Sequence, residues 1–102
     1  IDPNYAEAYF NLGNVFADSG QLDNAIENYK LSVRFQPGNA FFRNMLGITY
    51  GQKGAYKEAV EQFEEAVRLD PSEPAYRRNL DRASGMKNSR EKDRRVPATK
   101  DS

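Results

Sequence analysis

The fold is decided by two stretches of sequence: residues 12–37 read LGNVFADSGQLDNAIENYKLSVRFQP, and residues 46–71 read LGITYGQKGAYKEAVEQFEEAVRLDP. Placed one above the other, they match in glycine, aromatic residue and closing proline at an offset of 34 residues, and Pro3 continues the series one step back. Self-similarity at a fixed period is typical of repeat proteins, in which each unit is one supersecondary element.

Within each stretch, apolar residues recur at helical spacing, as Ile26, Tyr29 and Val33 do. Gly20 and Gly54 stand where the first helix of each unit must stop, and glycine accepts the left-handed conformation that reverses the chain. We therefore expect pairs of antiparallel helices. The expected helices span residues 4–18, 22–35, 39–52, 56–69 and 73–86.

Small residues are expected where paired helices approach closely. Gly13 and Gly47 recur in register, and aromatic residues such as Tyr29 and Phe63 are expected to fill the space between the layers. Asparagine and serine are good helix N-caps, so Asn39 and Ser72, each just after a closing proline, are predicted to start the third and the fifth helix.

This pattern resembles the tetratricopeptide repeat (TPR) family, whose unit is a helix, a tight turn and an antiparallel second helix. The residues that carry the resemblance are, in the first unit, Leu12, Gly13, Phe16, Ala25, Tyr29, Ser32 and Pro37, and in the second, Leu46, Gly47, Tyr50, Ala59, Phe63, Ala66 and Pro71. The resemblance implies an all-α fold, an alpha-alpha superhelix (TPR solenoid) of two helix-turn-helix repeats plus a C-terminal capping helix.

The period divides the chain into segments. We expect the end of a preceding repeat at residues 1–3, repeat 1 at 4–37, repeat 2 at 38–71, a capping helix at 72–86 and a disordered charged tail at 87–102. Asp81 and Ser84 replace the glycine and the aromatic residue that a following helix would need, so the fifth helix is expected to end the array. The opening Ile1-Asp2-Pro3 resembles the close of a repeat and predicts a fragment of a longer array.

Composition excludes several functions. The formal net charge is zero, so we expect no nucleic acid and no membrane as partner. The chain has no cysteine, which removes cysteine nucleophiles and thiolate metal sites, and no histidine, which removes the commonest general base and the commonest transition-metal ligand. We therefore expect no catalytic residue, no metal, no cofactor and no enzymatic activity. The compartment stays open; a soluble, cytoplasmic protein is favoured.

The resemblance also implies a binding surface, because in this family the first helix of each unit lines a concave groove where peptides bind. The residues expected to line the groove and bind a peptide are Phe10, Asn11, Asn14, Phe41, Asn44, Ile48, Arg78, Asn79 and Arg82. Asparagine amides can pair with any peptide backbone, and two arginines one turn apart can hold a carboxylate. On this interpretation Asn14→Ala leaves the stability nearly unchanged. The alternative is that these asparagines are ordinary surface residues and that Phe41 packs under a neighbouring hairpin.

One subfamily pattern can be tested on the residues. Co-chaperone repeats that clamp a C-terminal carboxylate use lysine and asparagine in the first unit, asparagine in the second, and lysine with arginine in the third. Here only Asn14 matches, because Phe10, Met45, Ala75 and Asn79 occupy the other positions. The sequence does not predict a carboxylate clamp.

Two functions remain open. The first is a protein-protein interaction module of TPR type that binds a protein or peptide ligand in the groove. The alternative is a self-assembly module, since the first helix carries Tyr5, Tyr9 and Phe10 without a cap to cover that end. Upstream repeats or a second copy of the chain, giving a homo-oligomer, would cover it.

Overall fold

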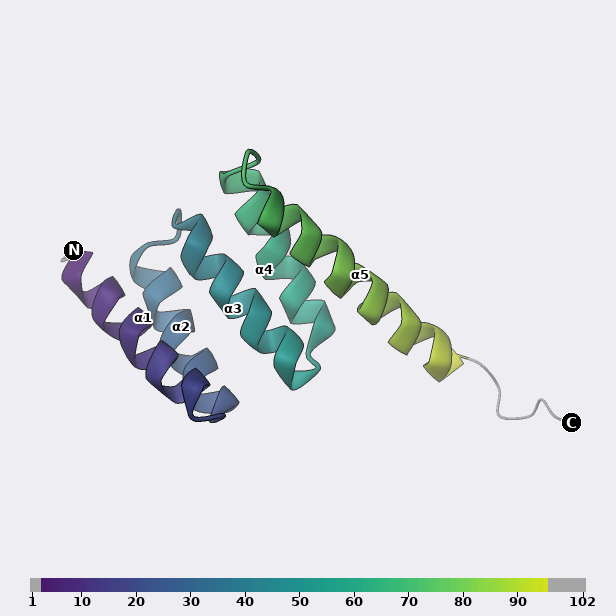
Figure 1. Ribbon diagram of the computed structural model, residues 1–102, viewed down its shortest axis with the longest axis horizontal. Coiled ribbons are helices and arrows are strands. Elements are labelled where there is room, and N and C mark those ends of the chain that lie inside the picture. The colour runs from purple at the N-terminus through teal and green to yellow at the C-terminus, as the bar shows by residue number, and fades with distance from the viewer. Residues whose placement is uncertain (1–2, 96–102) are drawn as a thin grey trace, which may run out of the picture.

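The structure is a row of helices joined by short turns. It is a computed structural model that describes the backbone of residues 3–95 and the side chains of residues 5–92. The helices are, in chain order, α1 (Pro3–Asp18), α2 (Leu22–Phe35), α3 (Ala40–Lys53), α4 (Tyr56–Leu69) and α5 (Pro74–Arg95). The expected all-α architecture, two helical hairpins followed by a capping helix, is confirmed (Figure 1).

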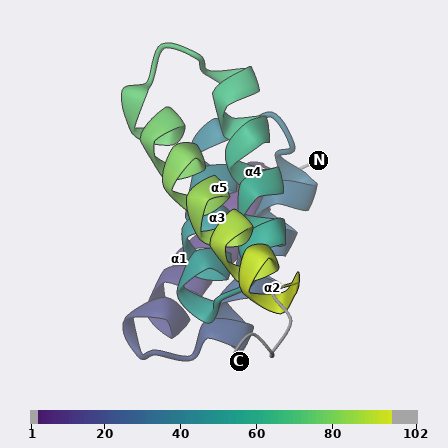
Figure 2. The ribbon, with the colours of Figure 1, turned by 90° about the vertical axis from the view of Figure 1, so that its right-hand side faces the viewer.

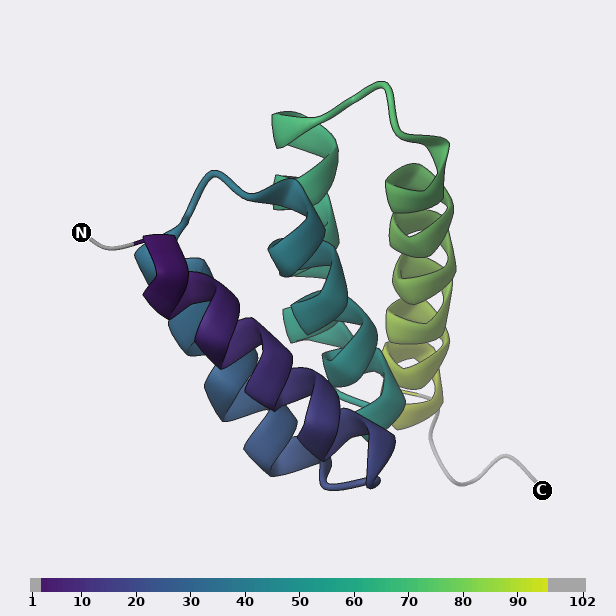
Figure 3. The same cartoon turned by 60° about the vertical axis from the view of Figure 1, so that its left-hand side comes forward.

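The hairpins stack with their first helices on one side and their second helices on the other. α1, α3 and α5 lie side by side, with α2 and α4 behind them (Figure 3). Seen from the α5 end, the row shows α5 and α4 nearest the viewer (Figure 2). We call the side formed by α1, α3 and α5 the first-helix face.

Each hairpin turns on a glycine with a left-handed backbone. Gly20 has φ 76° and Gly54 has φ 87°, a region that strains other L-residues. At the second turn the N–H of Ala55 donates to the carbonyl of Tyr50 at 2.9 Å, and the first turn holds the equivalent bond. These bonds satisfy backbone groups that a helix end would otherwise leave unpaired. The predicted chain reversals are confirmed.

The two predicted helix caps have different outcomes. Asn39 Oδ1 accepts a hydrogen bond from the N–H of Phe42 at 3.0 Å, so Asn39 is the N-cap of α3 as predicted. The prediction for Ser72 is wrong, because its hydroxyl donates to Asp70 at 2.7 Å and α5 begins only at Pro74. Proline is favoured at the first helical position, where its fixed φ suits the helix and its missing N–H is not needed.

The apolar core is continuous along the row. The first cluster lies where α1, α2 and α3 meet, and its buried members are Ala6, Phe10, Ala25, Ile26, Tyr29, Phe42 and Leu46. The second cluster lies between α4 and α5, and its buried members are Ala59, Val60, Phe63 and Ala83. Tyr50 packs against both clusters and so joins the two hairpins into one body.

Within each hairpin an aromatic ring lies directly against a glycine of the paired helix. A Cβ atom added to Gly13 would stand 2.6 Å from Cδ1 of Tyr29, and one added to Gly47 would stand 2.7 Å from Cε1 of Phe63. Both distances are shorter than real Cβ contacts, so only glycine leaves room for the ring. The expected combination of small residues and filling aromatic rings is confirmed.

α5 is longer than the sequence predicts. The predicted capping helix ends at residue 86, yet the helix continues to Arg95, so the predicted disorder is wrong for residues 87–95. Arg90 Nη1 donates to the carbonyl of Gly54 at 2.6 Å, and the guanidinium carbon lies 4.9 Å from the ring centroid of Tyr56. A cation–π contact at an exposed site contributes about 0.5–1 kcal/mol. Both contacts tie the end of α5 to the α3–α4 turn.

The two predicted end segments are only partly described. Pro3, expected to close a preceding repeat, is the first residue of α1. Residues 1–2 and the tail residues 96–102 lie outside the described part of the chain.

Gly47→Ala is predicted to lower the free energy of unfolding by about 1–3 kcal/mol, because the new methyl group overlaps the Phe63 ring. Gly51→Ala is the matched control in the same helix. A Cβ atom there meets nothing within 4 Å, and alanine is favoured over a helical glycine by about 0.5–1 kcal/mol. Urea denaturation of the three proteins checks the prediction. Equal stability of Gly47→Ala and the wild type would contradict it.

Candidate functional site

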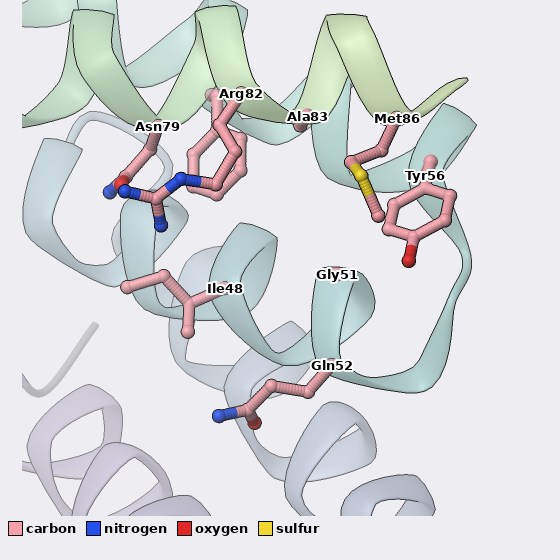
Figure 4. Close-up of a pocket in the computed structure, with 9 residues that line it drawn as sticks. Ile48, Gly51, Gln52, Tyr56, Asn79, Arg82, Ala83 and Met86 are labelled. Carbon is pink, nitrogen blue, oxygen red and sulfur yellow. The ribbon is translucent and has the colours of Figure 1, made fainter. Parts of the chain in front are cut away.

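A pocket of 340 Å³ opens between α3 and α5 (Figure 4). Its walls come from α3, α4 and α5, and the lining residues are Ile48, Gly51, Gln52, Tyr56, Phe63, Asn79, Arg82, Ala83 and Met86. Three residues predicted for the groove, Ile48, Asn79 and Arg82, are thus brought together around one pocket.

The α5 wall follows from helical spacing. Asn79, Arg82, Ala83 and Met86 stand at positions i, i+3, i+4 and i+7, which share one face of a helix. The sequence interpretation missed Met86, although its place one turn after Arg82 was a usable signal. It also missed Tyr56, whose position beside the pocket depends on the turn at Gly54 and has no sequence pattern of its own.

Asn44 and Asn79 form a bridge between α3 and α5. The side-chain Nδ2 of Asn79 donates to Oδ1 of Asn44 at 2.9 Å, and Asn44 is buried. A buried amide that is already paired is structural, so Asn44 is not a free binding group. The bond orients Asn79, which is only half-buried, with its carbonyl oxygen available to another donor.

A second polar pair lies inside the first hairpin. The hydroxyl of Tyr29 donates to Oδ1 of Asn14 at 2.5 Å, and Tyr29 is completely buried. Burial raises the pKa of Tyr29 above its ordinary value of 10.0, and the charge of Asp18 adds to this, so the hydroxyl stays protonated and keeps donating. Asn14 therefore has a structural role beside any role in binding.

The two groove phenylalanines differ. Phe10 is buried and stacks on Phe42 with ring centroids 4.6 Å apart, so it belongs to the core and offers no surface for a ligand. Phe41 is 50% exposed and touches Phe10 with its ring centroid 5.5 Å away. The alternative in which Phe41 packs under a neighbouring hairpin is wrong. An exposed aromatic ring thus stands on the first-helix face at α3.

The remaining groove residues are exposed and polar. Asn11 lies exposed on α1, and Arg78 and Arg82 lie exposed one turn apart on α5. Neither of these two arginines has an ion-pair partner among the described residues, whereas Arg77 pairs with Asp81 at 3.6 Å. The α5 part of the face therefore carries unpaired positive charge.

The described residues contain neither a metal-binding cluster nor a helix that could span a membrane. No three or more His, Cys, Asp or Glu residues between residues 3 and 95 gather where they could hold a metal ion. In the same part of the chain, no helix combines the length and the apolar character needed to cross a bilayer. The first-helix face offers amides for hydrogen bonding, apolar contact at Phe41 and the pocket, and two arginines.

Asn14→Ala is predicted to lower the free energy of unfolding by about 1–3 kcal/mol, because it leaves the buried Tyr29 hydroxyl without a partner. This revises the expectation from the sequence alone. Asn11→Ala, an exposed site on the same helix, is the control and should leave the stability within about 0.5 kcal/mol of the wild type. Thermal denaturation checks both. Asn14→Ala is also made in a Tyr29→Phe variant, which lacks the hydroxyl. If it lowered the stability of that variant as much as that of the wild type, loss of the hydrogen bond would not be the cause.

The fold recurs in solved structures of other proteins. The second TPR domain of Spaghetti (RPAP3), bound to the HSP90 peptide SRMEEVD, is 23% identical with a TM-score of 0.80, over 85% of this chain and 81% of that one. The first TPR domain of Spaghetti, bound to the same peptide, is 21% identical with a TM-score of 0.80, over 84% of this chain and 68% of that one. The MamA protein is 23% identical with a TM-score of 0.79; 89% of this chain matches half (50%) of MamA.

Family models match the same part of the sequence that carries the period. A TPR repeat model matches residues 13–54, and a tetratricopeptide repeat model matches residues 40–73. Together they cover both hairpins except most of α1, and the matched residues include both glycine-to-ring contacts. The 34-residue period, the stacked helical hairpins and these matches agree, and the chain belongs to the tetratricopeptide repeat family.

Proposed function

We propose that this chain is a protein-protein interaction module, without catalytic activity, that binds a peptide or a partner segment along its first-helix face. The observation that carries the proposal is the exposure of Phe41 on the same face as a pocket and two arginines, Arg78 and Arg82, that have no ion-pair partner in the described part of the chain. Aromatic residues and arginine are enriched in protein interfaces, where a few of them contribute most of the binding energy.

Each exposed group on the face suits an extended peptide. The backbone of such a peptide has unpaired N–H and C=O groups, which amides such as Asn11 and Asn79 can match whatever the peptide sequence. Phe41 offers apolar contact, and Arg78 with Arg82 can hold an acidic group by charge-assisted hydrogen bonds. The buried residues Phe10 and Asn44 would support the face from beneath.

The similar structures favour the same function but not the same contacts. Both Spaghetti domains were solved with the HSP90 peptide SRMEEVD. In this chain Phe10, Met45 and Ala75 stand where the carboxylate-clamping repeats have lysine or asparagine. Phe10 is buried and Met45 packs against the first core cluster, so neither can hold a terminal carboxylate. We propose that this chain recognises its partner through other groups of the face.

Phe41→Glu is predicted to weaken peptide binding at least about tenfold, because it removes apolar contact from the middle of the face. The probe is the tightest heptapeptide selected from a random display library on the immobilised chain, made synthetically and measured by fluorescence anisotropy. Lys30→Glu, an exposed charge change on α2, is the control and should alter the affinity less than about twofold. A library that yields no binding peptide, or a peptide indifferent to Phe41→Glu, would contradict the proposal.

A second candidate function, self-association, rests on the outer side of α1. Leu12 and Val15 are 43% and 59% exposed. Their equivalents one repeat later, Leu46 and Thr49, are each only 2% exposed, and Leu46 packs in the first core cluster with residues of the preceding hairpin. The same register position is therefore covered in the second hairpin and open in the first. A second copy of the chain that packed on this side would bury it.

If α1 mediates self-association, sedimentation equilibrium of the wild type will show a mass that rises with concentration. The double variant Leu12→Glu with Val15→Glu is then expected to stay monomeric, because two carboxylates would have to be buried in the interface. Both sites are exposed, so the helix content by circular dichroism should not change. Lys30→Glu should associate as the wild type does. A wild type that remains monomeric at all concentrations would rule out this candidate.

A further inference from the structure

The pocket between α3 and α5 has apolar walls. Ile48, Phe63 and Met86 line it from three different helices, and Tyr56 closes the end beside Met86 (Figure 4). Pockets for whole small molecules occupy about 300–1,000 Å³, so a volume of 340 Å³ is at the small end of that range. The space is large enough to admit one bulky apolar side chain of a peptide.

The pocket has apolar walls because two polar residues of the first repeat are replaced by apolar residues at the equivalent positions of the second. In the first hairpin the hydroxyl of Tyr29 bonds to Asn14, and in the second the same two positions hold Phe63 and Ile48. A polar pair has thus been replaced by an apolar pair in register. The second hairpin therefore presents carbon where the first presents a satisfied hydrogen bond.

The pocket is open because α5 carries smaller residues than α3 at matching positions. Asn79 and Ala83 stand one period after Met45 and Thr49. Met45 packs against the first core cluster, whereas the shorter Asn79 and Ala83 line the pocket. Gly51 adds to the space, since a Cβ atom there would meet nothing within 4 Å.

The rim of the pocket is polar and positively charged. Asn79 and Arg82 extend from α5 toward Ile48 at the end opposite to Met86 and Tyr56 (Figure 4). The bond from Asn79 to Asn44 uses an N–H of the amide and leaves its carbonyl oxygen to accept a peptide N–H. Arg82 has no ion-pair partner among the described residues, so an acidic side chain placed beside the pocket would complement it.

We propose, on the basis that the first-helix face binds peptides, that this pocket and Arg82 form one subsite for an extended partner segment with a bulky apolar residue and an acidic residue separated by one residue. In an extended chain alternate side chains point the same way, about 6–7 Å apart. The apolar side chain enters the pocket, its backbone N–H donates to Asn79, and the carboxylate meets Arg82. Arg78, one turn away, adds to the positive charge.

The probes are acetylated heptapeptides Gly-Ser-X-Ser-Z-Ser-Gly, with X as Ala, Leu, Met or Phe and Z as Asp, Asn, Glu or Gln, and the same set in reverse order. In fluorescence anisotropy, Leu, Met or Phe at X should bind at least about tenfold more tightly than Ala in one of the two directions. An acid at Z should bind about threefold to fivefold more tightly than its amide, as for an exposed ion pair. Absence of either preference in both directions would overturn the subsite.

Two variants, each with a matched control, separate the parts of the subsite. Gly51→Leu places a side chain at a pocket-lining position where a Cβ atom meets nothing within 4 Å, and should remove the preference for a bulky residue at X. Gly85→Leu, one period later and equally open at Cβ, should keep that preference. Arg82→Gln should remove only the preference for an acid at Z, and Arg77→Gln should keep both preferences. Equal binding of Leu at X by Gly51→Leu and Gly85→Leu would overturn the proposal.

The subsite and the proposed function can fail separately. If peptides from the random library bind in a way that needs Phe41 but share no apolar and acidic pair, the face is a peptide site and the subsite is wrong. If no library peptide binds the chain, the proposed function and the subsite are both wrong. If the library peptides are enriched in the apolar and acidic pair and no longer bind the Gly51→Leu variant, both the proposed function and the subsite are supported.

Discussion

The contact of an aromatic ring with a bare glycine backbone sets the geometry of the whole chain. Tyr29 on Gly13 and Phe63 on Gly47 fix how close the two helices of each hairpin lie. Once that distance is set, the tip of each ring reaches toward the first-helix face. In the first hairpin the tip is the Tyr29 hydroxyl, which donates a hydrogen bond to Asn14. In the second it is the bare edge of the Phe63 ring, which lines the pocket. One packing contact thus determines both the repeat and the chemistry of its surface.

Elements that depend on local spacing were predictable from the sequence. The turns at Gly20 and Gly54 and the N-cap at Asn39 each follow from residues a few positions apart, and the structure has them. The 34-residue period was predictable because the sequence repeats itself, residue by residue, at that offset. The end of α5 was not predictable in this way. Residues 87–95 look like a solvated tail, and the contacts of Arg90 with Gly54 and Tyr56 join positions more than thirty residues apart.

The candidate site was predictable by position but not by role. Helical register identifies which residues lie on the first-helix face, but it does not show which of them are buried in the core. Phe10 and Asn44 are buried, one among stacked rings and the other in a bond to Asn79, while Phe41 and Arg82 reach solvent. Whether each residue is buried depends on how closely the first helix of the neighbouring hairpin packs against it. The spacing of residues along the sequence does not give that distance.

The two junctions along the first-helix face are closed by different contacts. α1 and α3 are joined by the stack of Phe10 on Phe42, a contact between buried rings that cannot slide without opening a void. α3 and α5 are joined at this face by the bond between Asn44 and Asn79 beside an open pocket. Because Asn44 is buried, a group that displaced Asn79 from this bond would have to replace it as the partner of Asn44. On the proposed function, a partner would therefore meet closed ring packing at the α1–α3 junction and an open pocket beside an amide pair at the α3–α5 junction.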